Sequence, residues 1–274
     1  MLEKAPATRF RLGRPEAVID RLTMEAALEL AVNGEPFTVT MRTPGDERLL
    51  ARGLLHTEGV VSDPRATIAW REELYDGTRI VRRIDATVPP GALVLDFAGK
   101  RALLSTSSCG ICGKLDIAAT GLEGCPVKLT HGDRLDVARV PEMMRRLRAE
   151  QEAFEFTGGS HAAALFTPGG EFLALFEDIG RHNAVDKAVG WMIERRVAPR
   201  ARVLAVSGRV SYEIVAKAYR AQIPFLLAVS APSGLAVQMA KQFGITLLAF
   251  CRDDRATAYS HPEHLISEGL SVTP

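Results

Sequence analysis

The sequence predicts an α/β fold: a mixed sheet covered by helices in the second half of the chain, with a smaller β-rich region before it. After residue 160, short apolar runs alternate with helical segments, which is typical of a parallel or mixed sheet whose faces carry the helices. Before residue 101, short apolar runs are instead separated by turn signals. The 274 residues suffice for one large or two modest domains, and an apolar content of 47% supports a core.

The chain is expected to divide into four parts without internal repeats or low-complexity tracts. They are an irregular lead-in over residues 1–20, a β-rich region over 21–104, a cysteine-containing loop and connector over 105–139, and an α/β domain over 140–274. A hairpin is predicted early in the β-rich region, with strands at 28–32 and 37–41, because Asn-Gly between apolar runs is a strong hairpin signal. A helix over 24–30 is the alternative, since Ala, Leu and Glu dominate that stretch. We favour the hairpin.

The remaining elements follow from apolar spacing and from the residues that begin and end them. A helix is predicted over 46–57, between Gly45 and Gly59, and further strands of the first half over 67–70, 78–84 and 93–97. A basic amphipathic helix is predicted over 141–154, where Arg145, Arg146 and Arg148 are expected to form a solvated face rather than a binding patch. In the second half we expect strands over 162–166, 171–176, 203–206, 225–229 and 246–250, and helices over 183–194, 212–221 and 235–243.

Composition excludes several classes of function. The net charge is +1 with acids and bases interspersed, so no nucleic-acid partner is expected. No apolar run approaches the length of a membrane span, and the first twenty residues lack the apolar core of a secretory signal. Four cysteines in a chain of this size do not make a disulfide framework, so a reducing cytoplasm is the expected compartment.

The stretch around which the chain is organised is a Cys-x-x-Cys pair, Cys109 and Cys112, set among Gly, Ser and Thr residues. Such a segment is expected to be a mobile loop, and Lys114 favours the reactive thiolate. Sulfur or redox chemistry at the pair is one interpretation. A metal site is the second, because Cys125 and His131 complete a Cys₃His set; small thiols in a turn are the third. A lone CxxC does not separate these alternatives.

A second candidate site comes from polar clusters at predicted strand ends. In such sheets ligands bind where strands lead into helix N-termini, whose free N–H groups attract anions. The clusters fall at residues 157–161, 177–183, 207–211 and 230–234. Arg181 and Arg209 add forked donors, which together suggest a phosphorylated ligand such as a nucleotide, although simple helix capping explains any one cluster alone.

Three side chains of these clusters have two interpretations each. His182 is either an acid–base group or a packing histidine at a helix start. Asp178 either belongs to the site or caps the same helix. His161, beside Gly-Gly, either touches a ligand or satisfies a turn.

Five stretches together resemble the FdhD family of formate dehydrogenase accessory sulfurtransferases. The similarity extends from the Asn33-Gly34 hairpin to Arg252, and the eleven-residue block beginning at Glu177 is its most specific part. The stretches are Cys-Gly-Ile-Cys-Gly over 109–113, Thr-Gly-Gly-Ser-His-Ala-Ala over 157–163, Glu-Asp-Ile-Gly-Arg-His-Asn-Ala-Val-Asp-Lys over 177–187, Ser-Gly-Arg-Val-Ser over 207–211 and Ala-Pro-Ser-Gly-Leu-Ala over 231–236.

The resemblance implies a cytoplasmic homodimer with a cytidine-deaminase-like α/β domain. By the same resemblance, Cys109 accepts persulfide sulfur from a cysteine desulfurase, with Cys112 as its partner, and the sulfur passes to the molybdenum bis-guanine-dinucleotide cofactor needed by formate dehydrogenase. GDP or GMP is expected to bind as a surrogate ligand. The matching cofactor-binding segment consists of Phe250, Cys251, Arg252, Asp253, Asp254 and Arg255, and the expected site is completed by His161, Asp178, Arg181, His182, Ser207, Arg209 and Ser230.

The late segment departs from the family pattern. The family usually has Gly before the Phe and Arg-Gly after it, whereas this chain has Ala249 and then Arg252 followed by Asp253 and Asp254. Two carboxylates near a phosphate-bearing ligand are electrostatically unfavourable. The alternative function is a guanine-nucleotide cofactor-binding chaperone without catalysis, in which Cys109, Cys112, Cys125 and His131 form a zinc clip.

Overall fold

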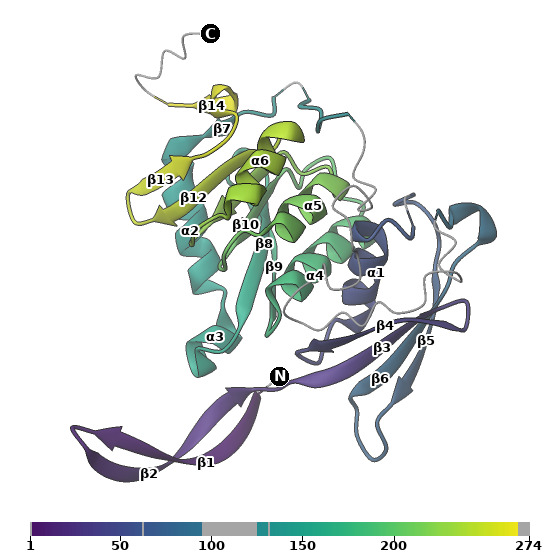
Figure 1. Ribbon diagram of the computed structural model, residues 1–274, viewed down its shortest axis with the longest axis vertical. Helices are drawn as coiled ribbons and strands as arrows, with labels where there is room; N and C mark the ends of the chain where they lie inside the picture. The colour runs from purple at the N-terminus through teal and green to yellow at the C-terminus, as the bar shows by residue number, and fades with distance from the viewer. Residues whose placement is uncertain (1, 62, 95–124, 131, 268–274) are drawn as a thin grey trace.

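The computed structural model describes residues 2–61, 63–94, 125–130 and 132–267, and its centre is a six-stranded mixed sheet (Figure 1). The sheet order is β13-β12-β11-β10-β8-β9, with β10, β11 and β12 parallel and the other pairings antiparallel. This arrangement confirms the predicted mixed α/β fold. The strands are β8 (His161–Phe166), β9 (Phe172–Asp178), β10 (Val203–Val206), β11 (Phe225–Ala228), β12 (Thr246–Arg252) and β13 (Arg255–Ala258).

Helices cover both faces of this sheet, as the alternation of strands and helices predicts. One face packs against α4 (Arg181–Glu194), α5 (Tyr212–Arg220) and α6 (Gly234–Gln242) in a core of small and branched apolar side chains. The other face packs against α2 (Val140–Ala149). The helix predicted over 141–154 is two helices, because the chain leaves α2 at Glu150 and restarts as α3 (Glu152–Thr157).

A four-stranded sheet, ordered β4-β3-β6-β5, forms the N-terminal region. Its strands are β3 (Ala26–Val32), β4 (Glu35–Arg42), β5 (Ala69–Leu74) and β6 (Val81–Thr87). The predicted hairpin is confirmed: Asn33 and Gly34 both have positive φ, as a two-residue hairpin turn of this kind requires. In place of a strand over 93–97, Leu93 makes one isolated bridge to Val61, and residues 95–97 lie outside the described residues.

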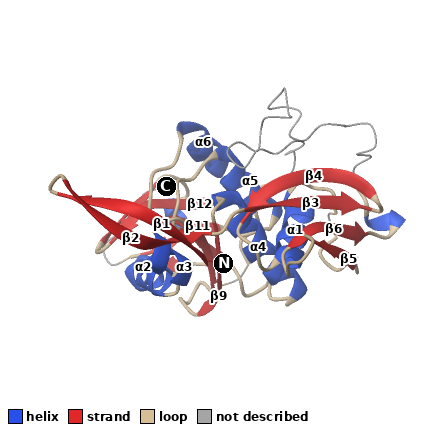
Figure 2. Cartoon of the chain, turned by 90° about the horizontal axis from the view of Figure 1, so that it is seen from below, coloured by secondary structure: helices blue, strands red, loops and turns tan. Residues whose placement is uncertain are grey.

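Helix α1 (Glu47–Thr57) joins the two regions, and Figure 2 shows α1 and α4 between the two larger sheets. The two helices meet backbone to backbone at Gly53 and Gly190. A Cβ atom at Gly53 would lie 1.8 Å from the Asp186 carbonyl oxygen, and one at Gly190 would lie 1.9 Å from that of Leu49. Only glycine fits at this crossing, so these two residues set the distance between the regions.

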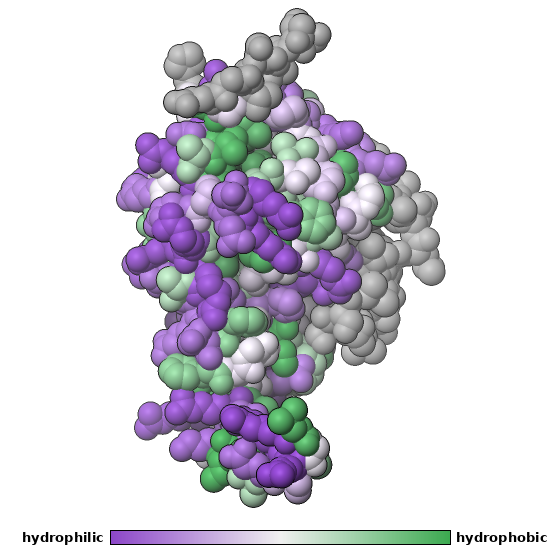
Figure 3. Space-filling view, turned by 90° about the vertical axis from the view of Figure 1, so that its left-hand side faces the viewer, coloured by the Kyte–Doolittle hydropathy of each residue, from purple (hydrophilic) through white to green (hydrophobic). Residues whose placement is uncertain are grey.

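The prediction of an irregular lead-in over residues 1–20 is wrong. The chain there forms a long antiparallel hairpin, β1 (Leu2–Arg11) and β2 (Arg14–Thr23), whose turn has positive φ at both Leu12 and Gly13. Leucine is an unusual residue for that backbone conformation, so the sequence gives no turn signal. The hairpin extends from the body as the lower lobe of Figure 3, whose surface is partly hydrophobic and partly hydrophilic. Phe10 and Ile19 are among its exposed apolar side chains.

Five short elements complete the described chain. They are the 3₁₀ turns η1 (Pro90–Ala92), η3 (Val137–Arg139) and η4 (Pro262–His264), and the strand pair β7 (Leu135–Asp136) and β14 (Leu265–Ile266). Strand β13 was not predicted, since the last expected strand ended at residue 250. Within the described ranges, none of the helices has the length and apolar character needed to cross a membrane.

Candidate functional site

The predicted polar clusters converge on one edge of the six-stranded sheet. The parallel strands β10, β11 and β12 end there, and β8 begins there because Ala163 pairs with Val206 in antiparallel register. Strand β9 ends there too, since His161 pairs with Asp178. The topology therefore brings together the segments that sequence reasoning placed at separate strand ends.

A cavity of about 1160 Å³ opens at this edge, on the face covered by α2. It is bounded by α2, α3, the Gly158-Gly159 turn and the turn between β12 and β13. Its volume exceeds the range of about 300–1,000 Å³ that is common for small-molecule pockets. Six predicted site residues line it: His161, Ser207, Cys251, Arg252, Asp253 and Asp254.

Two arginines of α2 also line the cavity, and sequence reasoning missed them. Arg145 and Arg148 lie three residues apart, on the same side of the helix, and their ion-pair partners are Glu142 and Glu155. Arg146 fits the prediction of a solvated face: it pairs with Glu150, and no part of it reaches the cavity wall. The spacing of Arg145 and Arg148 predicts that they share one side of the helix, but it does not show that this side faces a cavity.

Glu177 fixes the wall formed by α3. Its carboxylate accepts hydrogen bonds from the backbone N–H groups of Ala153 (2.7 Å) and Phe154 (2.9 Å), at the positive end of α3. It also accepts a 2.5 Å hydrogen bond from the Ser160 hydroxyl. One side chain of β9 thus holds both the short helix and the turn that leads into β8.

His161 lies between the cavity and a second pair of arginines, Arg181 and Arg209. Its ring packs against Gly208, where a Cβ atom would be 3.3 Å from Nδ1. Burial lowers the pKa of His161, and the positive charges of Arg181 and Arg209 lower it further. The imidazole is therefore neutral at neutral pH and can both donate and accept a hydrogen bond.

Asp178 and Lys187 are buried and bonded only within the protein, so a bound ligand would not reach the Asp178 carboxylate. The Lys187 ammonium lies 2.8 Å from Asp178 Oδ2 and also donates to the carbonyl oxygens of Thr43 and Glu177. Asp178 accepts from the N–H groups of Thr43 and Gly180 and from the Asn183 side chain. This network joins the end of β4 to the start of α4, so the contacts of Asp178 are structural. They do not cap the helix, because no side chain of the described residues hydrogen-bonds to the N–H groups of the first turn of α4.

The contacts of His182, at the start of α4, favour the packing interpretation. Its Nε2 lies 3.4 Å from the Ser211 hydroxyl and 3.8 Å from Glu213. Burial lowers its pKa to about 4, with help from the charges of Lys217 and Arg181. It is neutral at pH 7 and its contacts are internal.

Arg181 and Arg209 form a second basic group on the α4 and α5 side of the edge. Arg209 is exposed, whereas Arg181 is half-buried, with an Nε that has no hydrogen-bond partner among the described residues. Neither residue lines the cavity. Ser207 and Ser230 act within the fold: the Ser207 hydroxyl accepts from the Ala162 N–H, and the Ser230 carbonyl accepts from the Phe250 N–H.

The segment from Phe250 to Arg255 turns sharply at the edge. Phe250 has a φ of 52° and packs against the core on the α4–α6 side, so it does not line the cavity. Cys251 is buried on the opposite face, and burial raises its pKa to about 11, which makes it an unreactive thiol.

Asp253 occupies the tight turn between β12 and β13 with a φ of 50°, a conformation in which glycine is most at ease and Asp is tolerated. The Arg252 guanidinium donates to the Val229 carbonyl oxygen, and Arg255 is exposed opposite it in the hairpin. The two aspartates therefore lie at the rim of the cavity, within a segment that otherwise contributes positive charge.

The predicted sulfur-carrying cysteines, Cys109 and Cys112, lie outside the described residues, as does His131. Cys125 is described and exposed, and its carbonyl oxygen accepts a hydrogen bond from Tyr219. The zinc set proposed from the sequence is therefore represented in the described chain by Cys125 alone.

Comparison with known proteins gives one consistent result. The model of the FdhD/NarQ family matches the chain from residue 23 to residue 266. A protein of Streptomyces coelicolor named "Sulfur carrier protein FdhD" is 41% identical over 263 residues, covering 94% of this chain and 93% of its own, and its namesake in Mycobacterium tuberculosis is 44% identical over 270 residues, covering 93% of each. A namesake in Sulfolobus acidocaldarius is 35% identical and covers 96% of this chain and 98% of its own.

The fold matches as well. The crystal structure of a protein from Desulfotalea psychrophila, described as a formate dehydrogenase accessory protein, superposes with a TM-score of 0.74 over 97% of this chain and 99% of the other, at 20% identity. At that identity the superposition establishes the fold alone. With a family model that spans nearly the whole chain and relatives above 40% identity, the chain belongs to the FdhD/NarQ family.

Proposed function

We propose that this protein is a sulfur carrier that loads sulfur on Cys109 and delivers it to a bound guanine-dinucleotide molybdenum cofactor, which is its substrate, in support of a formate dehydrogenase. The observation that carries the proposal is the extended identity with proteins named sulfur carriers. The candidate CxxC supplies the thiols that such a role requires. The cytoplasm, a cysteine desulfurase as donor, and a homodimer are part of the same proposal.

Loading is a displacement at sulfur. The Cys109 thiolate attacks the terminal sulfur of the desulfurase persulfide, so a new S–S bond forms while the old one breaks and the desulfurase cysteine leaves as a thiolate. Release uses the second cysteine: the Cys112 thiolate attacks Cys109 Sγ, forms a Cys109–Cys112 disulfide and frees the terminal sulfur at the oxidation level of sulfide. A dithiol reductant then restores both thiols.

The arginines at the strand-end cavity support the binding of a phosphate-bearing ligand there. Arg145, Arg148 and Arg252 offer guanidinium donors, and Gly158 and Gly159 present backbone without side chains to obstruct a phosphate. Arg181 and Arg209 stand on the other side of His161, so a cofactor with two nucleotide arms has a basic group for each.

Asp253 and Asp254, at the rim of the cavity, are better suited to bind the guanine base than the phosphates. Guanine presents an N2 amino donor and an N1–H donor side by side, and a carboxylate can accept both. We assign this recognition to Asp253 or Asp254, whose position at the cavity rim would otherwise repel the ligand. The assignment predicts that Asp253→Asn or Asp254→Asn narrows the preference for GDP over ADP.

The first experiment is intact-protein mass spectrometry after incubation with a cysteine desulfurase and cysteine. We expect a gain of sulfur that is removed by reductant, maps to Cys109 and is absent from Cys109→Ala. Equal loading and equal activation of a formate dehydrogenase by Cys109→Ala would refute the role of this residue.

Calorimetric titration with GDP tests the cavity separately from sulfur loading. Loss of one charge-assisted contact is expected to weaken binding roughly tenfold or more in Arg145→Gln and Arg148→Gln. Arg146→Gln, on the same helix but away from the cavity, is the matched control and is expected to bind as the wild type does. Equal affinity in all three variants would remove the α2 face from the site. Arg209→Ala is likewise expected to weaken GDP binding without affecting sulfur loading.

A further inference from the structure

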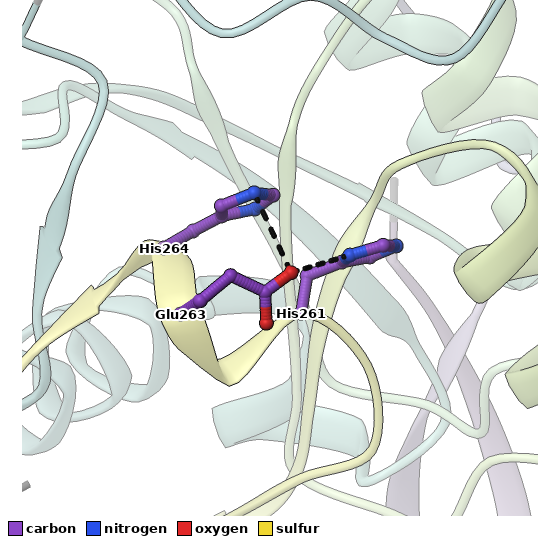
Figure 4. A group of neighbouring side chains, drawn as sticks. All are labelled: His261, Glu263 and His264. Carbon is purple, nitrogen blue, oxygen red and sulfur yellow. Dashed lines mark hydrogen bonds and ion pairs between the residues drawn. The ribbon is translucent and has the colours of Figure 1, made fainter. Parts of the chain in front are cut away.

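A second cluster of ligand-type side chains lies at the other end of β12 from the cavity. It comprises His261, Glu263 and His264, within and just before the 3₁₀ turn η4 (Pro262–His264), and its candidate ligand atoms all lie within 4.8 Å of one another. The cluster packs beside Thr246, the first residue of β12, whereas the cavity adjoins the last. Figure 4 shows both imidazoles directed at the Glu263 carboxylate.

Hydrogen bonds on the far side of each ring fix which nitrogen is free. His261 Nε2 lies 2.9 Å from the Lys241 carbonyl oxygen, which can only accept, so Nε2 carries the proton. In the neutral ring, Nδ1 then carries a lone pair, and it faces Glu263 Oε1 at 2.9 Å. Two acceptors at this distance repel each other unless a positive species joins them.

His264 is oriented in the same manner. The Thr246 hydroxyl can donate to the His261 carbonyl oxygen at 3.5 Å, which leaves it to accept from His264 Nδ1 at 2.9 Å. The lone pair of His264 is therefore on Nε2, which lies 3.8 Å from the same Glu263 oxygen. Carbonyl and hydroxyl partners that set the tautomer of a ligating histidine are a regular feature of metal sites.

We propose that His261 Nδ1, Glu263 and His264 Nε2 bind a divalent transition-metal cation of the Zn²⁺ type. With metal–ligand distances of about 2.0–2.2 Å, tetrahedral geometry separates the ligand atoms by about 3.3–3.6 Å. The separations of 2.9 and 3.8 Å from Glu263 Oε1 lie on either side of that range, and all the candidate ligand atoms lie within 4.8 Å of one another. The two imidazole rings are nearly parallel, with centroids 5.1 Å apart, so metal binding requires them to tilt toward a common point. A His₂Glu set with an open position is an established zinc ligand set.

The surroundings favour a tethering role for the cation. Glu263 is half exposed, and the two imidazoles are about one-fifth exposed, so a water molecule can take the fourth position. The ligands are tied to Lys241 in α6 and Thr246 in β12, and the metal would therefore bind the turn after β13 to both. Arg134, the neighbouring cation, donates to the carbonyl oxygens of Glu263 and Leu265 rather than to the carboxylate.

The test is titration of metal-free, full-length protein with Zn²⁺ by calorimetry and with Co²⁺ by absorption spectroscopy. We expect one site per chain whose cobalt spectrum has visible d–d bands without the near-ultraviolet thiolate charge-transfer band. That spectrum separates this site from one built on the cysteines. Zinc is also expected to raise the melting temperature of the wild type.

Variants assign the ligands. Glu263→Gln and His264→Gln are each expected to weaken zinc binding at least tenfold and to abolish the zinc-dependent rise in melting temperature. His261→Asn removes a ligand while suiting the left-handed backbone at this residue, whose φ is 48°. Thr246→Val removes the hydroxyl that accepts from His264 Nδ1 and donates to the His261 carbonyl oxygen, and it is expected to weaken zinc binding 10- to 100-fold.

Glu171→Gln is the control, because it removes an exposed carboxylate, paired with Arg200, far from η4 in the sequence. It is expected to bind zinc as the wild type does. Zinc affinity unchanged in both Glu263→Gln and His264→Gln would overturn the proposal. So would a wild-type cobalt spectrum that contains only the thiolate-bound species, or no metal binding at all.

Discussion

Replacing Asp178 by Asn tests whether the most specific segment of the sequence serves the fold or the ligand. The substitution keeps the shape of the side chain but leaves the Lys187 ammonium, 1% exposed, without its counter-charge. Removing one partner of a buried ion pair costs about 3–5 kcal/mol, because the remaining charge is desolvated and uncompensated. Since Asp178 also accepts three hydrogen bonds, the upper part of that range is expected.

The assay is urea and thermal unfolding followed by circular dichroism and tryptophan fluorescence. A chain of 274 residues has an unfolding entropy of roughly 0.58 kcal/mol/K near its midpoint, so a loss of 3–5 kcal/mol lowers the melting temperature by about 5–9 °C. Lys187→Met is expected to be similarly costly. The double variant should cost clearly less than the sum, because neither charge is then left alone.

A ligand titration completes this test. GDP affinity of folded Asp178→Asn is expected to equal that of the wild type, because the Asp178 carboxylate is buried beneath the edge. A cost below about 1 kcal/mol, or strictly additive single variants, would refute the reasoning on the ion pair. A large loss of GDP affinity at unchanged stability would instead return Asp178 to the binding site.

Two further predictions concern the helix crossing and the pH dependence of stability. Gly190→Ala is expected to lower the free energy of unfolding, measured by urea titration, by at least about 3 kcal/mol, because the new Cβ would lie 1.9 Å from the Leu49 carbonyl oxygen. Gly234→Ala is the control, since nothing lies within 4 Å of its new Cβ. In the same titration it is expected to be neutral or stabilising by up to about 1 kcal/mol. The pKa of His182 falls from 6.5 in the unfolded chain to about 4 in the fold, so the unfolded state binds this proton first as the pH is lowered. The contribution of His182 to stability is therefore constant above pH 6.5 and falls by up to about 3 kcal/mol as the pH drops toward 4. His182→Asn should reduce that slope, and an unchanged slope would contradict the assignment.

The sequence predicted best those elements whose signals are local. Residues 203–206 are a strand with the predicted boundaries, and the turn at Asn33-Gly34 forms the predicted hairpin. The hairpin over residues 2–23 was missed because its turn contains Leu12 in a backbone conformation that leucine seldom adopts. The break at Gln151 was missed because the helical spacing continues across it.

The sequence predicted that the polar clusters share one edge of the sheet, but not which face of the sheet carries the cavity. Sheet topology brings all four polar clusters to one edge, as expected from strand direction. A strand end, however, has two faces, and apolar spacing does not say which face a ligand uses. The cavity lies on the α2 face, so Arg145 and Arg148 enter the site while Arg181 and Arg209 stand on the other side.

The burial of charged side chains was the second feature that the sequence did not predict. Asp178 and Lys187 look like surface residues by composition, since unpaired charges are seldom buried. Their burial depends on contacts from Thr43, more than a hundred residues earlier, and no local pattern encodes such a contact. The structure was therefore needed to tell which residues of the block over 177–187 can contact a ligand and which only hold that block in the fold.

The end of β9 connects these two roles. Successive side chains of a strand point to opposite faces, so Glu177 and Asp178 contact different parts of the molecule. Glu177 holds α3 and Ser160 at the cavity, whereas Asp178 holds Thr43 and Lys187 at the junction with the N-terminal region. One strand end thereby fixes both the wall of the cavity and the attachment of the N-terminal sheet. Because the two networks share this backbone, displacement of β9 would disturb both the cavity wall and the junction with the N-terminal region.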